Sequence, residues 1–492
     1  MKRIIVLVAS VVFITACDDF LTTKPKGTYY SDNYDLSSSQ ELMIISKLFD
    51  GYDEYRNQTW PLTALQCLTN DNTHMGGPAG DGGTDFNQFP TLTFTPSNNH
   101  IYNYYNSHFI IITKANEALQ MIDDYEKEHG ESTASCQYRA EAYFLRGSAY
   151  FRLTQAFGAV PYVDHVMGKN DEVPEQISAS SIRDKYLTDL IWGVPYLPTR
   201  LQMVQTGNLG RATQNAARAI IAKTYMYEGN WGACRDWTKQ IISSGDNSLF
   251  TPYGEIWWET NEYCSESVWE LNCDFKPSIN IDMRCQWCMM NGVRGMPNLG
   301  WGHNAPSADL MSDYEQGDPR YEATVLEDKQ MIDGDQVEAS HYKFFNHKCY
   351  CPKSERTQYN RDDWCYGYWA NLRIIRYSDV ILMYAEACLE TGDIDEAKSA
   401  IEMVRSRARN GKSPVTCLPA PSSRDANELR TFLHHERRIE LALEFERYFD
   451  LVRWGEAAEK LPGFQVGKHE LFPLPQQEID KANGKLVQNP GY

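Results

Sequence analysis

Apolar residues recur at helical spacing in several parts of the chain. Between residues 374 and 388 a set of them recurs at steps of mostly three or four positions. Because a helix completes a turn in about 3.6 residues, this spacing puts the apolar side chains on one face. The pattern predicts an amphipathic helix with the following buried face: Ile374, Tyr377, Ile381, Tyr384, Ala385 and Cys388.

Two segments repeat one spacing of small residues around a glycine. In both, a small residue is followed at offset 7 by glycine and at offset 12 by another small residue: Ala222, Gly229, Cys234 and Ala385, Gly392, Ala397. This spacing is typical of a tetratricopeptide helix pair, in which glycine ends the first helix in a left-handed conformation. Asp393 to Glu396 then has the sequence of a capping box that begins the second helix.

Two further helical units are less regular. Residues 139–157 form a partial copy whose second helix we expect over 181–192, and residues 428–459 form a fourth unit. The copies are separated by 75 and 163 residues, whereas tandem repeats of this kind recur about every 34 residues. For the fourth unit we expect the following core residues: Ile439, Leu443, Phe449 and Val452.

Long irregular insertions separate the helical units. Residues 57–100 and 250–370 show no sustained helical period, and no Gly/Ser-rich or Pro-rich linker divides the chain. The sequence therefore predicts one mostly α domain over 17–492, in which helix pairs form a scaffold and the insertions carry the ligand face. Loops on a rigid scaffold commonly carry binding residues.

The first sixteen residues have the order of a bacterial lipoprotein signal. Lys2 and Arg3 precede an apolar run from Ile4 to Ile14, and small residues lead to Cys17. The run is shorter than the roughly 20 apolar residues that span a bilayer. We expect cleavage of residues 1–16 and acylation of Cys17, with more than one acyl chain anchoring the protein in a membrane.

The chain is acidic. Its formal charge is −19, and removal of residues 1–16, which contain Lys2 and Arg3 but no acidic residue, makes it −21. Such a surface repels phosphate groups, so the sequence predicts no nucleic-acid partner. The acyl anchor, rather than charge, must hold the protein to a membrane.

Twelve cysteines follow Cys17, and an exported protein normally oxidises its thiols. The sequence does not indicate which of them pair. The alternative is a zinc site, because four thiolates can close a tetrahedral metal site. The cysteines that suggest it are Cys285, Cys288, Cys349, Cys351 and Cys365.

Several strings in chain order resemble the SusD/RagB family of outer-membrane nutrient-binding lipoproteins. The N-terminal and central strings are Cys17 to Leu21, Arg139 to Arg146 with Phe157 to Pro161, and Arg376 to Ala387. The C-terminal ones are Glu436 to Glu440, Arg447 to Gly455, Leu471 to Pro475 and Gln488 to Tyr492. We interpret the charged residues in these strings as structural, since charges on amphipathic helices usually pair with one another.

The resemblance implies a fold, a location and a partner. It implies four tetratricopeptide-like units, an irregular ligand-binding face and a SusC-like TonB-dependent transporter beneath the protein. Known members mostly capture glycans at the cell surface, and a minority serve peptide uptake. We therefore expect a lipid-anchored outer-membrane protein that faces the cell exterior and delivers an oligosaccharide, with a RagB-like peptide-capturing protein as the alternative.

Tryptophans concentrate in the second insertion, which suggests a sugar site there. Seven of the twelve lie between residues 257 and 369, and flat rings pack well against the C–H face of a sugar. Four of them lie in sequence rich in Gly, Asn and Cys, so we take them as candidates for ligand contact, with burial as the alternative. These four candidates are Trp287, Trp301, Trp364 and Trp369.

The first insertion supplies polar groups and one more ring. Its candidates for ligand binding are Asp71, Asn72, Asp85 and Phe86. Glycan-binding members of the family often have Trp at the place of Phe86. Asp81 and Asp85 between glycines could instead bind calcium, but EF-hand spacing is absent.

No motif of a known catalytic class is present. The sequence has no G-x-S-x-G, H-E-x-x-H or Walker lysine loop, so it predicts no catalytic residue, no metal and no cofactor. A surface glycosidase is the rival hypothesis, because glycoside hydrolysis needs only two suitably placed carboxylates.

Overall fold

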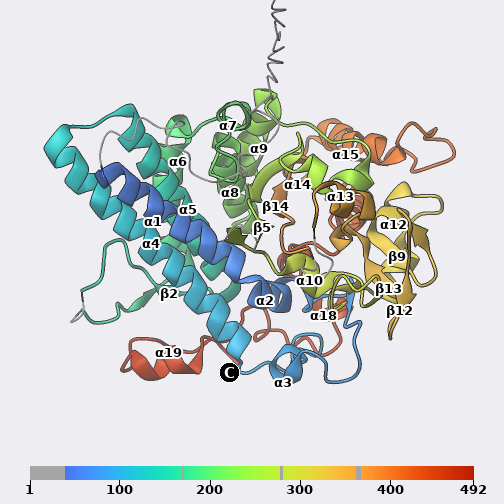
Figure 1. Cartoon of the computed structure of the whole chain (residues 1–492), viewed down its shortest axis with the longest axis horizontal. Helices are drawn as coiled ribbons and strands as arrows, with labels where there is room; N and C mark the ends of the chain where they lie inside the picture. Colours follow the sequence, from blue (N-terminus) through green and yellow to red (C-terminus); the bar gives the residue numbers. More distant parts are fainter. Residues whose placement is uncertain (1–38, 169–170, 277–280, 362–366) are drawn as a thin grey trace, which may run out of the picture.

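The computed structural model describes residues 39–168, 171–276, 281–361 and 367–492, and it is mostly helical (Figure 1). Long helices occupy one side of the molecule, and short helices and strands occupy the other (Figure 1). Cys17 and Trp364 lie outside the described residues. Among the described helices, none combines the length and the apolar character needed to cross a membrane.

The N-terminal half is a layer of long antiparallel helices. Helix α5 contacts both α4 and α6, and α1 lies against α4 and α5. The expected partner of the 139–157 segment is thus found in α6. The bounds in this half are α1 (Ser39–Asn57), α4 (Asn99–His129), α5 (Thr133–Phe157), β2 (Val160–Pro161), β3 (Gln176–Ile177), α6 (Ala179–Gly193), η4 (Val194–Tyr196) and α7 (Arg200–Thr206).

The two predicted helix pairs are confirmed, and each turns at its glycine. Gly229 has a φ of 68° and Gly392 a φ of 83°, both in the left-handed region that glycine adopts without a Cβ penalty. The side chain of Asp393 accepts a hydrogen bond from the backbone N–H of Glu396 and caps the second helix. The pairs are α8 (Gln214–Tyr227) with α9 (Trp231–Ser244), and α14 (Tyr377–Glu390) with α15 (Ile394–Arg409).

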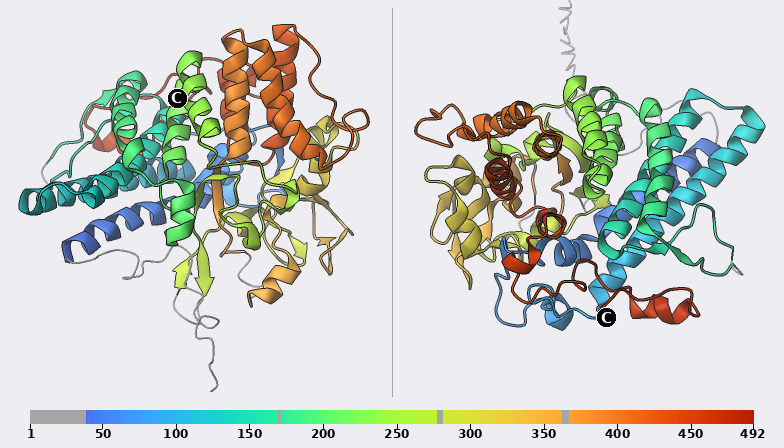
Figure 2. Two further views of the ribbon diagram at one scale, coloured as in Figure 1. Left: turned by 90° about the horizontal axis from the view of Figure 1, so that it is seen from above. Right: turned by 180° about the vertical axis from the view of Figure 1, so that it is seen from behind.

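The fourth unit is broken after its first helix. Its segments are α16 (Ala426–Glu440), α17 (Arg447–Trp454) and α18 (Ala457–Lys460), followed near the C-terminus by α19 (Gln476–Lys481). Leu443 lies between α16 and α17 with a positive φ of 63°. Helix α16 packs on α14 and α15, and the three stand together in Figure 2. Ile439, Leu443 and Phe449 are buried as expected, and Val452 is partly buried.

Both insertions consist of short elements, as the missing helical period predicted. The first contains α2 (Thr59–Leu62), the π-helix η3 (Thr63–Cys67), β1 (Thr73–His74) and α3 (Gly83–Phe86). The helices of the second are η5 (Tyr253–Glu255), η6 (Glu259–Asn261), α10 (Trp287–Asn291), α11 (Ala308–Asp313), α12 (Pro319–Thr324), η8 (His347–Cys349) and α13 (Lys353–Gln358).

The described strands form seven two-stranded antiparallel pairs. Strand β1 pairs with β8, with His74 opposite Ala305, so the two insertions are joined directly. The strands from residue 267 onward are β4 (Ser267–Leu271), β5 (Asp274–Lys276), β6 (Ile281–Met283), β7 (Gly295–Met296), β8 (Ala305–Pro306), β9 (Val325–Glu327), β10 (Met331–Ile332), β11 (Asp335–Gln336), β12 (Glu338–Ala339), β13 (Phe344–Asn346) and β14 (Leu372–Arg376).

A buried ion network joins the C-terminal helices to the second insertion. Glu436 and Glu440 on α16 are fully buried. Glu436 accepts from Arg320 of α12 at 2.5 Å and from Arg405 of α15 at 2.7 Å. Glu440 pairs with arginines of three elements, which hold its pKa at about 2 although burial would raise it. Those arginines are Arg320, Arg376 and Arg407.

A second set of ion pairs fixes the first insertion to the same helices. Asp71 accepts two hydrogen bonds from Arg447 of α17, both 2.7 Å long. Burial would raise the pKa of Asp71, but Arg447 outweighs burial and lowers it. The neighbouring Asn72 accepts from Arg438 of α16 at 2.8 Å. The start of the loop is therefore anchored before it reaches the surface.

We predict that Gly392→Ala destabilises the protein by about 1–2 kcal/mol, because a Cβ disfavours the left-handed conformation. Apart from the adjoining residues, nothing lies within 4 Å of the position that the added methyl group would occupy, so backbone strain is the main cost. Chemical denaturation measures the change. Gly232→Ala is the control, since Gly232 of α9 has equally open space and an ordinary helical φ. Equal stability of the two variants would contradict the turn assignment.

We predict that Arg447→Met destabilises the protein by about 3 kcal/mol, because it leaves the buried Asp71 carboxylate without its main partner. Arg424→Met removes a similar pair with Asp395, but those side chains are 67% and 70% exposed, so its midpoint should not change measurably. Urea unfolding of both variants tests the difference. An unchanged free energy of unfolding in Arg447→Met would show that this ion pair does not hold the insertion.

Candidate functional site

Two tryptophans from different insertions meet at the surface. Trp60 on α2 and Trp301, which follows α10, have ring centroids 5.3 Å apart. Trp301 is 36% exposed and Trp60 is half-buried, so both rings keep accessible area. Helix α2 contacts α10 and α4, which fixes the position of Trp60. We call Trp60 and Trp301 the ring pair.

Buried rings support the ring pair from below. Phe86 is fully buried, with its centroid 5.4 Å from that of Trp60. His100, in the first turn of α4, stacks on Trp60 at 6.2 Å, and His303 lies 5.9 Å from it. Burial lowers the pKa of His303 to about 4 and also lowers that of His100. Both imidazoles are therefore neutral at physiological pH.

Glycines let the two insertions approach each other. The N–H of Gly76 donates to the carbonyl of Gly302 at 3.0 Å, and a Cβ on Gly76 would lie 2.3 Å from that oxygen. Gly82 has a φ of 76°, and a Cβ there would lie 2.5 Å from the Phe86 ring. A side chain at Gly76 would push the two insertions apart, and one at Gly82 would collide with the Phe86 ring, so close contact requires glycine at both positions.

One ion pair lies beside the ring pair. Arg294 forms a salt bridge with Asp81, and both side chains are about a quarter exposed, at 27% and 22%. Arg294 also approaches the carbonyl oxygen of Trp301 at 3.5 Å. These two charges compensate each other, and the nearby Asp85 carboxylate, which acts on His100, leaves the surroundings of the ring pair without an unpaired cation among these groups.

A second pair of stacked rings lies on the same two insertions. His74 of β1 is exposed and stacks on Tyr342 with centroids 4.0 Å apart and planes 16° apart. The N–H of Tyr342 donates to the carbonyl of Gly76 at 3.3 Å. Because Gly76 also bonds to Gly302, backbone contacts connect this second stack to the ring pair.

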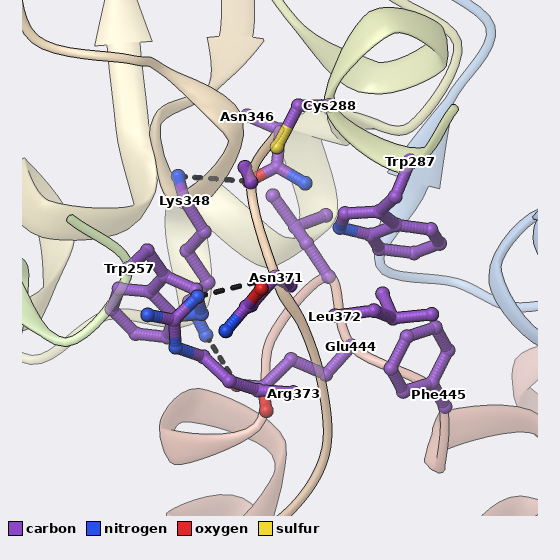
Figure 3. A pocket seen from close by; sticks show the side chains of 12 residues that line it. Trp257, Trp287, Cys288, Asn346, Lys348, Asn371, Leu372, Arg373, Glu444 and Phe445 are labelled. Carbon is purple, nitrogen blue, oxygen red and sulfur yellow. Dashed lines mark hydrogen bonds and ion pairs between the residues drawn. The ribbon is translucent and has the colours of Figure 1, made fainter. Parts of the chain in front are cut away.

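The structure buries two of the tryptophans that we expected to be exposed. Trp369 is 2% exposed, with the Arg361 guanidinium 5.1 Å above its ring. Trp287 is 8% exposed, with its centroid 4.7 Å from that of Phe445. It lines a small, partly open pocket of about 20 Å³ (Figure 3), which has room for a water but not for a sugar ring. We therefore reassign both to the core, and Trp301 stays a candidate.

The polar candidates of the first insertion have structural partners. Asp71 is paired with Arg447, and Asn72 is 1% exposed and bonded to Arg438. Asp85 accepts from the backbone N–H of Asn99 at 3.0 Å and from its side chain at 2.7 Å, at the start of α4. Phe86 belongs to the buried base. Asn72 and Phe86 are closed to a ligand by burial, whereas Asp71 and Asp85 are only partly buried and stay predictions.

Metal ligands do not assemble among the residues that the structure describes. No group of three or more His, Cys, Asp or Glu side chains there is arranged to hold a metal ion. Asp81, considered for calcium, is paired with Arg294. The cysteines considered for zinc are buried, apart from Cys365, which lies outside the described residues.

Sequence reasoning missed Trp60, His74 and Tyr342. Trp60 directly follows the polar residues Asn57-Gln58-Thr59 near the start of the first insertion, and a tryptophan at such a boundary is a usable signal. His74 and Tyr342 are 268 positions apart in the chain, and they stack because β1 pairs with β8 and Tyr342 bonds to Gly76 and Pro306 beside that pair. No local pattern could have associated them.

The chain matches known proteins along most of its length. A sequence model described as starch-binding and associating with the outer membrane matches residues 19–226, and the SusD family model matches residues 265–470. The SusD-like protein P2 of Formosa agariphila is 25% identical over 84% of this chain and 85% of its own. A SusD-like protein of Bacteroides ovatus is 22% identical over 92% and 82%.

Solved structures share the fold. A laminarin-binding SusD-like protein superimposes with a TM-score of 0.74 at 26% identity, covering 92% of this chain and 99% of its own. A SusD homologue from Bacteroides thetaiotaomicron has a TM-score of 0.77 at 22% identity, covering 92% and 97%. Surface glycan-binding protein A of the same species, in complex with laminarihexaose, has a TM-score of 0.74 at 22% identity, covering 91% and 99%.

The two family models match the N-terminal and the C-terminal half of the chain. The two helix pairs predicted from the sequence are present in the structure. The chain belongs to the SusD/RagB family.

Proposed function

We propose that this protein captures an oligosaccharide at the cell surface and passes it to a SusC-like TonB-dependent transporter of the outer membrane. The ring pair of Trp60 and Trp301 is the observation that carries the proposal. Partly exposed aromatic faces on a rigid base suit the C–H face of a pyranose, while its hydroxyls remain free for polar neighbours.

The charge balance around the ring pair favours an uncharged sugar. The imidazoles beneath it are neutral, because burial lowers the pKa of His100 and of His303. The Arg294 and Asp81 charges compensate each other. An anionic ligand would need an unpaired cation at the site to offset its desolvation, whereas hydroxyl groups can share hydrogen bonds with the existing pair.

Similar proteins support the choice of a glycan. One structure with this fold, 26% identical to the chain, is a laminarin-binding protein, and another was solved with laminarihexaose. The model that matches residues 19–226 is described as starch-binding. Laminarihexaose and a malto-oligosaccharide are therefore the first two probes.

The anchoring and delivery steps follow from the N-terminal sequence and the family. Lipidation of Cys17 would hold the protein at the outer membrane. The description of the family model includes association with the outer membrane. With several acyl chains in the bilayer the attachment is stable, so the protein can cover a transporter without a charged membrane-binding surface.

Binding without hydrolysis is the activity we propose. A glycosidase needs two carboxylates on opposite sides of the scissile bond. Asp81 and Asp85, which lie on the loop beside the ring pair, already pair with Arg294 and cap α4. Neither is positioned as a free acid or nucleophile.

We predict that Trp301→Ala weakens binding of the recognised glycan by about 2 kcal/mol, or roughly 30-fold, because it removes one face of the ring pair. Isothermal titration calorimetry with laminarihexaose and maltoheptaose measures the loss. Trp192→Ala is the matched control, since Trp192 on α6 has the same exposed fraction of 36% but lies outside both insertions.

Other outcomes of this experiment distinguish the alternatives. Unchanged affinity in Trp301→Ala and in Trp60→Ala would place the site elsewhere. Binding of a peptide digest that depends on Trp301, with no glycan binding, would favour peptide uptake. Steady release of reducing ends from a bound glycan would establish a glycosidase instead.

We predict that Cys17→Ser abolishes palmitate labelling and releases the protein from the outer-membrane fraction, because the acyl chains need the Cys17 sulfur. Metabolic labelling and membrane fractionation test this. Cys67→Ser is the control, since Cys67 is buried and should not affect labelling. Full labelling of the Cys17→Ser variant would refute the lipoprotein assignment.

A further inference from the structure

Two cysteines flank the hairpin of β5 and β6. Cys273 directly precedes β5, and Cys285 follows β6 by two residues. The last paired residues of the ladder are Asp274 and Met283, so both cysteines lie at the open end of the hairpin, where its strands separate. Both are buried, with exposed fractions of 4% and 0%.

The same segment holds both cysteines in place. The backbone N–H of Cys273 donates to Oδ1 of Asn371 at 2.7 Å. The N–H of Cys285 donates to the carbonyl of Tyr368 at 2.9 Å. Because Tyr368 and Asn371 are only three residues apart, these bonds hold both cysteines against one short segment, and the Cys285 side chain lies close enough to Cys273 to influence its ionisation.

The surroundings argue against a catalytic role for this pair. Burial raises the pKa of Cys273 well above its ordinary value, and the Cys285 side chain raises it further. A reactive cysteine needs a stabilised thiolate and access to solvent, and this pair has neither. A buried and contacting pair suits a structural bond instead.

The other contacting thiols differ from this pair. Cys288 has both Cys349 and Cys351 as thiol neighbours, so it has two competing partners. For Cys273, Cys285 is the thiol neighbour that influences its ionisation among the residues described. All these cysteines are free thiols in the structure, and the hairpin pair is the one without a competing neighbour.

We propose that Cys273 and Cys285 form a disulfide in the exported protein. This inference rests on the outer-membrane location in the proposed function. The two thiols lose two protons and two electrons as the S–S bond forms, and the disulfide of a periplasmic thiol–disulfide oxidoreductase accepts them and becomes a dithiol. The bond closes the base of the hairpin just before α10, which carries Trp287.

The bond also restricts the unfolded chain. It closes a short loop from residue 273 to residue 285 and reduces the conformations open to that segment before folding. In the folded state it holds the two ends of the hairpin together, and their backbone N–H groups bond to Asn371 and Tyr368.

Peptide mapping without reduction tests the bond. Full-length protein from the outer membrane is denatured, its free thiols are alkylated, and it is digested with trypsin. Cleavage after Arg284 puts Cys273 and Cys285 in different peptides, so a disulfide keeps those peptides linked at a mass about 2 Da below their sum. We expect this linked species, and its loss on reduction.

Variants identify the partner. Cys285→Ser should remove the linked species, whereas Cys288→Ser should retain it, although Cys288 lies on the same tryptic peptide. In thermal melts, Cys285→Ser should lower the midpoint by several degrees more than Cys234→Ser, a buried cysteine on α9. Alkylation of both Cys273 and Cys285, or a link from Cys273 to another cysteine, would overturn the proposal.

A second sample separates this proposal from the proposed function. Protein without residues 1–16 is purified from a reducing cytoplasm and exposed to oxidised glutathione. If this sample forms the link and the outer-membrane sample does not, the two thiols are positioned to pair, but the protein is not oxidised during export as the proposed function requires. If neither forms it, the pairing itself is wrong, and glycan binding is unaffected by that result.

Discussion

The buried network around Glu436 and Glu440 is the interaction on which the rest of the structure depends. Helix α16 places both carboxylates in the interior, where an unpaired charge would cost several kcal/mol. Each is neutralised by arginines from other elements. These arginines come from α12, β14 and α15, so the network holds its charges only when the second insertion is docked on the helices.

This network gives the insertions a fixed foundation. Arg376 ends β14 and contacts Glu266, which precedes β4, so β4 of the second insertion and its partner strand β14 are tied to α16. The first insertion is fixed to the same helices by the bonds from Arg447 to Asp71 and from Arg438 to Asn72. Short loops with little regular structure can thus present rings in one arrangement, which limits the entropy lost when a ligand binds.

The tryptophans of the second insertion divide into two structural roles. Trp269 packs against Phe144 of α5 at 4.9 Å, and Trp287 against Phe445, so these rings connect the insertion to the scaffold. Trp301 instead projects from a glycine-rich loop and meets Trp60 at the surface. Tryptophan thus occurs both in the core and in the candidate site. A tryptophan is exposed only where its backbone segment runs along the surface.

The sequence by itself determined the helix pairs, because helical periodicity and the turn glycines Gly229 and Gly392 are local signals. It also indicated that the charges of 436–450 pair with one another and that the insertions lack long helices. Tertiary structure decided which rings are exposed. Burial of Trp287 and the meeting of Trp60 with Trp301 depend on contacts between segments that are far apart in the chain. Composition and spacing describe one segment at a time, and exposure is a property of how segments pack together.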